Sequence, residues 1–143
     1  MIKIQHDDFD TARETEALTA GRTDVGALVT FTGLVRDVAI ELEHYPAMAT
    51  RELQALEAEA ERRWPLKACL IIHRVGRLEP GARIVLVAAA SAHRADAFAA
   101  AEFLMDALKT RAPFWKREFH DDGPKWVEAA AKDDAAATRW QKR

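Results

Sequence analysis

Cysteine is nearly missing from this sequence of 143 residues, because Cys69 is the only one. A single thiol excludes an intrachain disulfide framework and a cysteine-rich zinc site. Cys69 lies in the apolar run Ala68–Ile72, which is typical of a buried strand, and buried thiols are usually unreactive. The sequence therefore predicts a structural cysteine rather than a nucleophile.

Long apolar stretches and a large excess of one charge are also missing. No run approaches the ~20 apolar residues of a membrane span, and the N-terminal segment does not resemble a signal peptide. We therefore expect a cytoplasmic protein that does not enter a membrane. The formal net charge of −2 argues against general nucleic-acid binding, because nothing attracts a phosphate backbone from a distance.

The residues that are present describe an ordinary globular protein. Hydrophobic residues make up 49% of the chain and charged residues 31%, which suits one folded domain over residues 1–143. Apolar residues at three- and four-residue spacing predict two long helices, at 48–64 and 95–108, and a shorter one that begins at Asp8 or Asp10 and runs to about Thr19. From about 129 to 143 an alanine-rich tail is expected to form a short helix or a frayed end.

Alternating and continuous apolar patterns predict the strands, at residues 2–5, 24–35, 40–45, 67–75, 83–90, 114–119 and 125–128. We expect the first to be an edge strand. We expect the 40–45 strand to pair with the 24–35 strand, so that residues 36–45 belong to a short hairpin. Strands and helices follow one another without a regular β-α-β order, which favours an α+β fold with a mostly antiparallel sheet.

The segment Leu108–Glu118 is the most distinctive part of the chain. It contains four cations within nine residues, and a proline and two aromatic residues lie between them: Lys109, Arg111, Pro113, Phe114, Trp115, Lys116 and Arg117. Clustered cations lower one another's proton affinity, so a lysine among them can act as a nucleophile or a base. The same cluster would hold a phosphate or a carboxylate.

Two further cationic positions stand out. Arg36 follows a predicted strand, and His93 and Arg94 lie where a buried strand meets a helix start that favours anions. Arg94 and Lys109 bracket one helix, so their backbones lie roughly 22 Å apart at 1.5 Å per residue. If both serve one small ligand, the simplest arrangement is a dimer in which the helix start of one chain meets the Lys109–Lys116 segment of the other.

The chain resembles the large, catalytic subunit of molybdopterin synthase, the MoaE family. The resemblance runs nearly end to end and is carried by these blocks in this order: Phe31–Arg36, Leu42–Pro46, His73–Gly76, Ser91–Arg94, Leu108–Glu118 and Asp122–Trp126. It implies a single-domain α+β fold of the α/β-hammerhead-like type.

The resemblance also implies a sulfurtransferase. Such proteins convert cyclic pyranopterin monophosphate (precursor Z) into molybdopterin, in molybdenum cofactor biosynthesis, by installing two sulfurs as a dithiolene. The sulfur arrives as a thiocarboxylate on the C-terminal Gly-Gly of a small ubiquitin-like subunit. Two such subunits dock on a dimer of the large subunit, which gives a heterotetramer, and the large subunit carries no cofactor of its own.

Residue roles follow from the same resemblance. Lys109 matches the principal catalytic residue and Lys116 a supporting one. Arg36, His93 and Arg94 match residues that line the substrate pocket, with the His-Arg pair supplied across the dimer interface. Lys109 could move protons as water leaves and sulfur enters, or it could attack the partner's terminal carbonyl to give an amide-linked adduct.

One part of the chain departs from the family pattern. Only Asp37–Glu41 separates the strand end at Arg36 from the Leu-Glu-His-Tyr block, where family members usually carry a longer, glycine-containing loop. Either the hairpin is shortened or the sequence lacks a stretch. A catalytically impaired relative that still dimerises and binds the ubiquitin-like partner is therefore the alternative function.

Two other functions are less well supported. A binding module for RNA or a phosphorylated ligand could use Trp115 and Trp126 as stacking platforms, but the net acidity opposes it. A metal site at His120–Asp122 is disfavoured, because adjacent residues in an acidic turn rarely converge on one ion. No metal is therefore expected.

Overall fold

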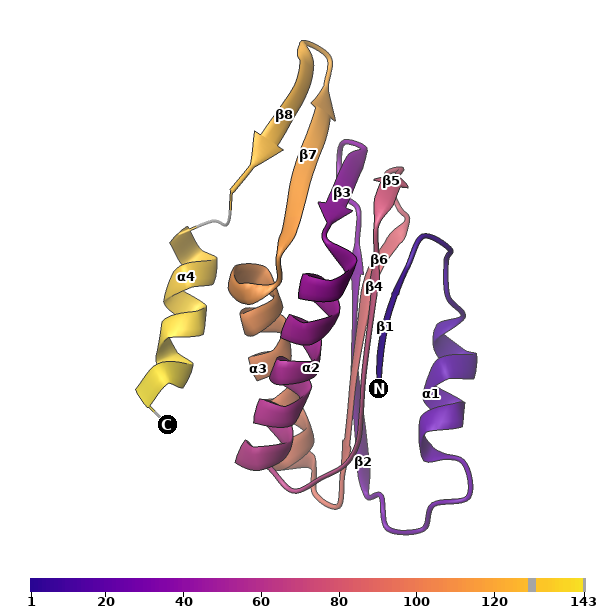
Figure 1. Ribbon diagram of the computed structural model, residues 1–143. Coiled ribbons are helices and arrows are strands. Elements are labelled where there is room, and N and C mark those ends of the chain that lie inside the picture. Colours follow the sequence, from indigo (N-terminus) through magenta and orange to yellow (C-terminus); the bar gives the residue numbers. More distant parts are fainter. Residues whose placement is uncertain (129–130, 143) are drawn as a thin grey trace.

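The computed structural model describes residues 1–128 and 131–142, and these fold into two four-stranded sheets with helices packed around them (Figure 1). The main sheet has the strand order β1-β4-β6-β2, with β1 (Ile2–Gln5), β4 (Leu66–Arg74), β6 (Arg83–Ser91) and β2 (Ala27–Leu34). The small sheet has the order β5-β3-β7-β8, with β5 (Gly76–Leu78), β3 (Ile40–His44), β7 (Phe114–His120) and β8 (Gly123–Val127). The strand pairs are antiparallel except β1 with β4, so the expected mostly antiparallel α+β fold is confirmed.

The helices cover both faces of the main sheet (Figure 1). Helix α1 (Thr11–Thr19) lies on one face, and α2 (Pro46–Arg63) and α3 (Arg94–Arg111) lie side by side on the other. Helix α4 (Ala131–Thr138) and the 3₁₀ turn η1 (Arg139–Lys142) pack outside α3. No helix in these described ranges combines the length and the apolar character that a bilayer crossing requires.

Burial on both faces explains why β4 and β6 read as continuous apolar runs. Leu70, Ile72 and Leu86 point toward α1 and pack with Phe9. The residues between them, such as Ile71 and Val87, point toward α2 and α3 and meet Leu53, Leu56, Phe103 and Leu104 in the largest core cluster. Cys69 belongs to this cluster, and burial raises the pKa of its thiol to about 12, so the predicted structural role is confirmed.

Local signals at the helix ends agree with the sequence. The Asp10 side chain accepts a hydrogen bond from the Arg13 amide and caps α1. Pro46 begins α2, where its missing amide proton costs nothing, and Pro65 follows the last residues of that helix. The helices expected at 48–64 and 95–108 are therefore confirmed. The first begins two residues earlier and ends one residue earlier than expected, and the second begins one residue earlier and ends three residues later.

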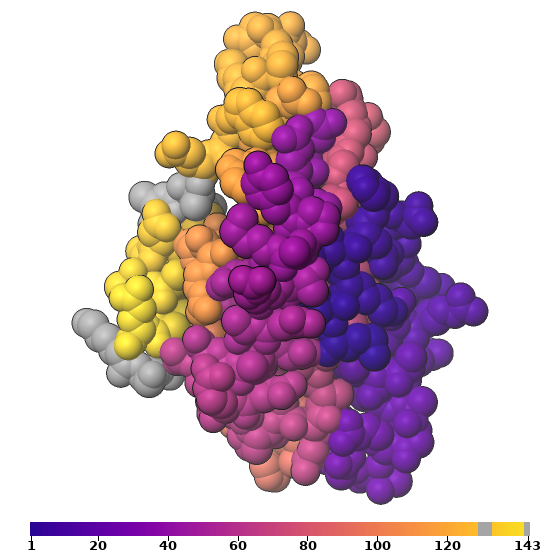
Figure 2. Space-filling model, viewed as in Figure 1, coloured from indigo at the N-terminus to yellow at the C-terminus, as the bar shows by residue number. Residues whose placement is uncertain are grey.

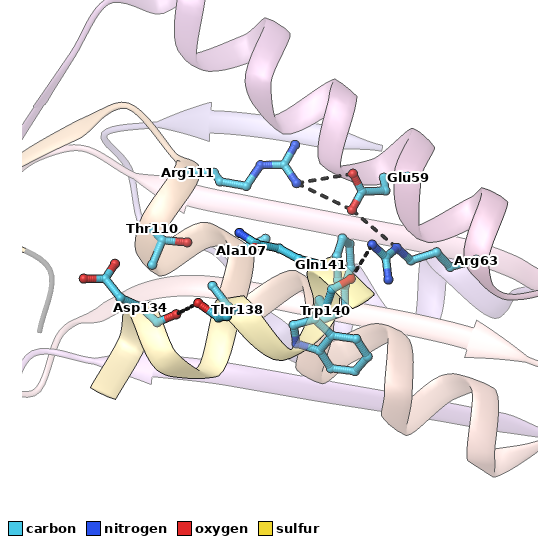
Figure 3. Close-up of a pocket in the computed structure, with 11 residues that line it drawn as sticks. Glu59, Arg63, Ala107, Thr110, Arg111, Asp134, Thr138, Trp140 and Gln141 are labelled. Atoms are coloured by element: carbon cyan, nitrogen blue, oxygen red, sulfur yellow. Dashed lines mark hydrogen bonds and ion pairs between the residues drawn. The ribbon is translucent and has the colours of Figure 1, made fainter. Parts of the chain in front are cut away.

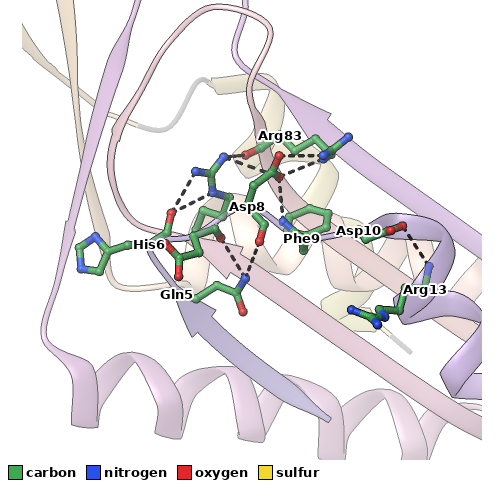
Figure 4. Close-up of polar contacts among 9 residues, drawn as sticks. Gln5, His6, Asp8, Phe9, Asp10, Arg13 and Arg83 are labelled. Atoms are coloured by element: carbon green, nitrogen blue, oxygen red, sulfur yellow. Dashed lines mark hydrogen bonds and ion pairs between the residues drawn. The ribbon is translucent and has the colours of Figure 1, made fainter.

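Ionic contacts hold the segment after β1 against the main sheet (Figure 4). The Asp8 carboxylate accepts hydrogen bonds from the Arg83 guanidinium at 2.7 and 3.0 Å and lies 3.8 Å from that of Arg74. These hydrogen bonds hold the pKa of Asp8 below its usual value. Arg74 also donates to the His6 carbonyl at 3.0 and 3.1 Å, so the turn that leads into α1 is tied to two strands.

The C-terminal segment is anchored by one tryptophan (Figure 3). The Trp140 indole donates to Asp106 of α3 at 2.7 Å, its carbonyl accepts from Arg63 of α2 at 2.8 Å, and its ring packs edge-on against Phe103. The described part of the expected 129–143 tail is thus a docked helix. Residues 129, 130 and 143 lie outside the described residues.

The small sheet corrects one prediction. β3 pairs with β5 and β7, whereas β2 pairs with β6 of the main sheet, so the hairpin expected over residues 36–45 is wrong. The alternation of the 40–45 segment identified a strand correctly, but alternation does not identify the partner. The partner β7 lies about 70 residues further along the chain, and the β7–β8 hairpin protrudes from the body beside β3 (Figure 2).

We expect the core between α2 and the main sheet to dominate stability. Leu53 is fully buried, so Leu53→Ala should lower the free energy of unfolding by about 2–5 kcal/mol. Met48→Ala on the same helix is the control, because Met48 is 47% exposed and its loss should cost less than about 0.5 kcal/mol. Urea unfolding at pH 7 measures both, and equal losses in the two variants would contradict the described packing.

Candidate active site

A pocket of about 430 Å³ opens where the two sheets meet the end of α3. Its cationic lining residues are Arg36, Lys109 and Lys116. The apolar lining comes from both sheets and from the end of α3, and consists of Ile40, Leu42, Ile84, Leu108, Ala112, Phe114 and Val127. The structure therefore brings together three of the five predicted site residues, from three separate parts of the chain.

The two lysines converge because of the way in which α3 gives way to β7. Lys109 lies in the last turn of α3, which ends at Arg111, and β7 begins at Phe114. Alternate residues of a strand face the same side, so Phe114 and Lys116 both line the pocket, and Trp115 faces the opposite side of the small sheet. The connection through Ala112 and Pro113 thus places both amines on one cavity.

Arg36 enters the pocket from the connection between β2 and β3. Its side chain is 90% exposed and lies 3.5 Å from the Asp37 carboxylate. Asp37 has a φ of 70°, a left-handed conformation that aspartate tolerates better than most residues. The short connection therefore carries Arg36 to the rim of the pocket, where a ligand anion could replace Asp37 as its partner.

The C-terminal segment contributes carboxylates to the same cavity. Glu128, which follows β8, and Asp133 of α4 line it beside the three cations. The sequence analysis missed both, because no local signal connects an alanine-rich tail with a lysine segment more than ten residues away. An anionic ligand that enters the pocket would meet the cations on one part of the wall and repulsion from these carboxylates on another.

A second pocket of about 380 Å³ adjoins the first at Lys109. It shares Ile84, Leu108 and Lys109 with the first pocket, and β2 closes it with residues that include Phe31 and Leu34. Both of these side chains are exposed, 43% and 57% respectively. Lys109 therefore lies between a polar pocket on one side and an apolar pocket, walled by the edge strand of the main sheet, on the other.

His73 contacts Phe114, one of the residues that line the pocket. Its ring stacks on that of Phe114, with centroids 4.0 Å apart and an angle of 16° between planes. Its Nδ1 lies 2.9 Å from the Arg74 carbonyl, so this nitrogen carries the proton. Burial lowers the pKa of His73 to about 4, and the positive charge of Lys109 acts in the same direction. The imidazole is therefore neutral, and its role is to pack on Phe114 and to hydrogen-bond the backbone.

His93 and Arg94 lie elsewhere in the chain's fold. His93 is the N-cap residue of α3 and Arg94 its first residue, so both stand at the opposite end of this 18-residue helix from Lys109. At 1.5 Å per residue the two ends are separated by roughly 22 Å between Arg94 and Lys109. The folded chain therefore keeps the two sites as far apart as the sequence predicts, and His93 and Arg94 do not line the lysine pocket of their own chain.

The acidic turn near the end of β7 forms no metal centre in the part of the chain that the structure describes, where no group of three or more His, Cys, Asp and Glu side chains is placed to hold an ion. The His120 Nε2 lies 3.1 Å from the Glu118 carboxylate. Asp122 pairs with Lys125 at 3.1 Å. Asp122 of this turn thus meets a local cationic partner.

The geometry defines an α+β protein with a small cationic pocket at a sheet junction, suited to bind an anion beside two amines. The chain belongs to the MoaE family, since the family model described as "MoaE protein" matches residues 4–111.

Comparisons with individual proteins agree with this assignment. The "Molybdopterin synthase catalytic subunit" of Mesorhizobium japonicum is 56% identical over 147 residues, covering 98% of this chain and 92% of that protein. That of Rhizobium meliloti is 55% identical over 149 residues, with 99% and 96% covered. High identity over almost the whole length of each chain extends the likeness to the lysine segment, which lies largely beyond the family match.

Solved structures share the fold. A "Molybdopterin biosynthesis MoaE protein" from Burkholderia ambifaria superimposes with a TM-score of 0.87 at 54% identity, covering 99% of this chain and 97% of that one. Molybdopterin synthase from Staphylococcus aureus gives 0.81 at 34%, with 87% and 95% covered. A complex of subunits 1 and 2 of molybdopterin-converting factor from Helicobacter pylori gives 0.73 at 21% over 92% and 91%, which shows the fold alone.

The buried His73 makes stability depend on pH. The unfolded chain has an ordinary histidine pKa near 6.5, so it binds a proton that the native state, with a pKa of about 4, does not. The contribution of His73 to the free energy of unfolding is complete above pH 6.5. It is lost as the pH falls from 6.5 to 4, and the loss amounts to about 3 kcal/mol at pH 4. Urea unfolding at intervals of half a pH unit measures this slope.

His73→Phe should flatten the slope. Some slope should persist, because burial also lowers the pKa of His44. His6→Asn replaces an exposed histidine and should retain most of the slope, because its charge contributes only to the lowered pKa of His44. Identical slopes in wild type and His73→Phe would show that His73 is not the group responsible.

Proposed function

We propose that this chain is the catalytic subunit of a molybdopterin synthase, a sulfurtransferase that converts cyclic pyranopterin monophosphate into molybdopterin. The observation that carries the proposal is the convergence of Lys109, Lys116 and Arg36 on one pocket, in a chain 56% identical to a molybdopterin synthase catalytic subunit. The proposal places the protein in the cytoplasm and requires no cofactor or metal from this chain.

The charges of the pocket suit the proposed reactants. The substrate carries a phosphate, and the sulfur donor is a thiocarboxylate, so both are anions that clustered cations attract. Fixed cations in a partly enclosed cavity hold such groups more strongly than cations in open water. Arg36 can form a forked pair with a phosphate, whereas the lysines act as point charges that can also exchange protons.

Lys109 is the residue proposed to act on the reacting atoms. It stands at the junction of the two pockets, so it can meet a substrate in one and a peptide tail in the other. Two roles are open to it: it moves protons as water leaves and sulfur enters, or its amine attacks the partner's terminal carbonyl and forms an amide-linked adduct. Lys116, two residues after Phe114 on β7, supports it by holding an anion in the polar pocket.

The proposed partner is a small ubiquitin-like subunit whose C-terminal Gly-Gly carries the thiocarboxylate. The Helicobacter pylori protein of the same fold forms a complex with a second subunit, and the proposal extends that arrangement to this chain. A glycine tail suits the site because it can enter a narrow cavity in an extended form, without side chains that would clash with the apolar wall.

A homodimer would complete the site. β2 is an edge strand of the main sheet and exposes Leu28, Phe31 and Leu34, and Phe98 on the neighbouring α3 is 61% exposed. Apolar side chains along an unpaired edge are typical of an interface.

The direction of β2 explains what the dimer would bring together. Its first residue, Ala27, pairs with Ser91, close to His93 and Arg94, and its last residues wall the pocket that contains Lys109. A two-fold axis across β2 would reverse one copy relative to the other, so His93 and Arg94 of one chain would approach Lys109 of its partner.

We expect Lys109→Ala to abolish product formation in a reconstituted assay that contains the protein, a thiocarboxylated ubiquitin-like partner and precursor Z. The loss should be at least about a hundredfold, because the substitution removes the group proposed to transfer protons or attack the carbonyl. Lys125→Ala is the matched control: Lys125 is an exposed lysine outside the pocket, on β8, and its removal should leave the rate unchanged.

Two outcomes would contradict this proposal. Unchanged activity in Lys109→Ala would exclude the assigned role. No product from the wild type, despite a stable complex with the partner, would favour the catalytically impaired relative and would direct attention to the short Asp37–Glu41 connection. Circular dichroism of each variant separates a chemical defect from a folding defect.

Mixed dimers test the composite site. Lys109→Ala and Arg94→Ala chains, co-expressed with different tags and purified through both, form a heterodimer with one intact site and one doubly altered site. Each homodimeric variant should be strongly impaired, whereas the heterodimer should recover about half of the wild-type rate, because dimer symmetry leaves one of two sites complete.

Other arrangements of the site predict a different activity for the heterodimer. If Arg94 and Lys109 of the same chain shared a site, every site of the heterodimer would lack one residue, and its activity would stay as low as that of the homodimers. A chain that sediments as a monomer at micromolar concentration would exclude the dimer altogether.

A further inference from the structure

The face of the small sheet opposite the lysine pocket carries rings and guanidinium groups in alternation. The Arg77 guanidinium lies over the Phe119 ring, 4.1 Å from its centroid. Arg117 lies between two rings, 5.3 Å from the centroids of both Phe119 and Trp126. Each guanidinium meets the electron-rich face of a ring, so this surface is already built around cation–π contacts.

A pocket of about 350 Å³ lies next to this row of rings and guanidinium groups, beside Trp126. Its walls are Glu43, His44, Tyr45, Trp115 and Trp126. In the sheet, Trp115 of β7 pairs with Glu43 of β3, and Trp126 of β8 pairs with Arg117 of β7. Tyr45 follows β3, so the three rings come from three adjoining segments. Tyr45 meets Trp115 edge-on, with centroids 5.4 Å apart.

The rings of this pocket are unusually accessible for residues of their type. Tyr45 is 61% exposed, Trp115 46% and Trp126 57%. Large aromatic side chains that gather at an exposed pocket, rather than in a core, are typical of binding sites. Core packing therefore does not account for their placement.

The two carboxylates on this face of β3, Glu41 and Glu43, differ in whether they have a cationic partner. Glu41 pairs with Arg117 of the neighbouring strand. Glu43, two residues later on the same face, is exposed at the pocket, and no ion pair joins it to a cation of residues 1–128. Burial lowers the pKa of His44, so this histidine adds no positive charge to the pocket at neutral pH.

We propose that this pocket binds the guanidinium group of an arginine side chain carried by a partner protein. The ligand would place a cation beside Trp115 and Glu43, and would continue the alternation that Arg77 and Arg117 begin. A guanidinium is planar and weakly hydrated, so it stacks on a ring while its edge donates to a carboxylate. Anions such as the proposed substrate are disfavoured here, because Glu43 repels them.

The site is separate from the catalytic pocket and does not depend on the proposed function. Phe114 and Lys116 face the lysine pocket, and Trp115 faces this one, so neighbouring residues of β7 serve opposite sides of one sheet. A partner held by its arginine at Trp115 would leave the entrance to Lys116 open.

Indole N–H resonances provide a direct test. The probe is the capped peptide acetyl-Gly-Arg-Gly-amide, and the control is the same peptide with citrulline, which has the shape of arginine without its charge. The arginine peptide should shift the Trp115 and Trp126 indole signals and leave the partly buried Trp64 and the buried Trp140 unmoved. The citrulline peptide should bind at least about tenfold more weakly.

Variants identify the contacts. Trp126→Leu should abolish the shift of the Trp115 signal, and Glu43→Gln should weaken binding about fivefold while it preserves shape. Glu61→Gln makes the same change to an exposed carboxylate on α2, outside the pocket, and should have no effect.

Three results would overturn the proposal. Equal binding of the arginine and citrulline peptides would make this an apolar pocket without charge selectivity. The absence of shifts at millimolar peptide would exclude the site. Binding of agmatine, a free guanidinium compound, without binding of the peptide would assign the pocket to a small metabolite instead of a protein partner.

Discussion

The stack of His73 on Phe114 is the contact on which the site depends. His73 belongs to β4 of the main sheet and Phe114 to β7 of the small sheet, so the pair joins the two sheets directly beneath the pocket. Phe114 lies between Lys109 and Lys116 in the sequence. The position of its ring therefore decides whether the end of α3 and the start of β7 present their amines to one cavity.

This contact also explains why a titratable residue occupies the core. A neutral imidazole can stack flat on a benzene ring and still satisfy its proton at the Arg74 carbonyl, whereas a protonated one would place a positive charge beside Lys109. Burial and the neighbouring amine favour the neutral form together. The two sheets are thus joined by an aromatic pair that stays neutral mainly because His73 is buried, with a smaller contribution from the charge of Lys109.

Much of the fold follows from local patterns. Asp10 and Pro46 mark helix starts, and the apolar runs of β4 and β6 identify strands buried on both faces. Pairing does not follow, because β3 meets β7 across a long separation in sequence and β5 is only three residues long. At the site, clustered cations identified Lys109 and Lys116. Glu128 and Asp133 gave no local signal, since only the tertiary fold brings the C-terminal segment to the cavity.

Helix α3 sets a fixed length between Arg94 and Lys109, the two residues proposed to meet in the composite site. Arg94 begins it and Lys109 lies in its last turn, and each residue of an α-helix turns the chain by about 100° and advances it by about 1.5 Å. Inserting one residue would therefore rotate Lys109 away from the cavity, even though every side chain remained present. Single-residue insertions or deletions within α3 would therefore disrupt the site. Changes in chain length are expected in the connections outside this helix.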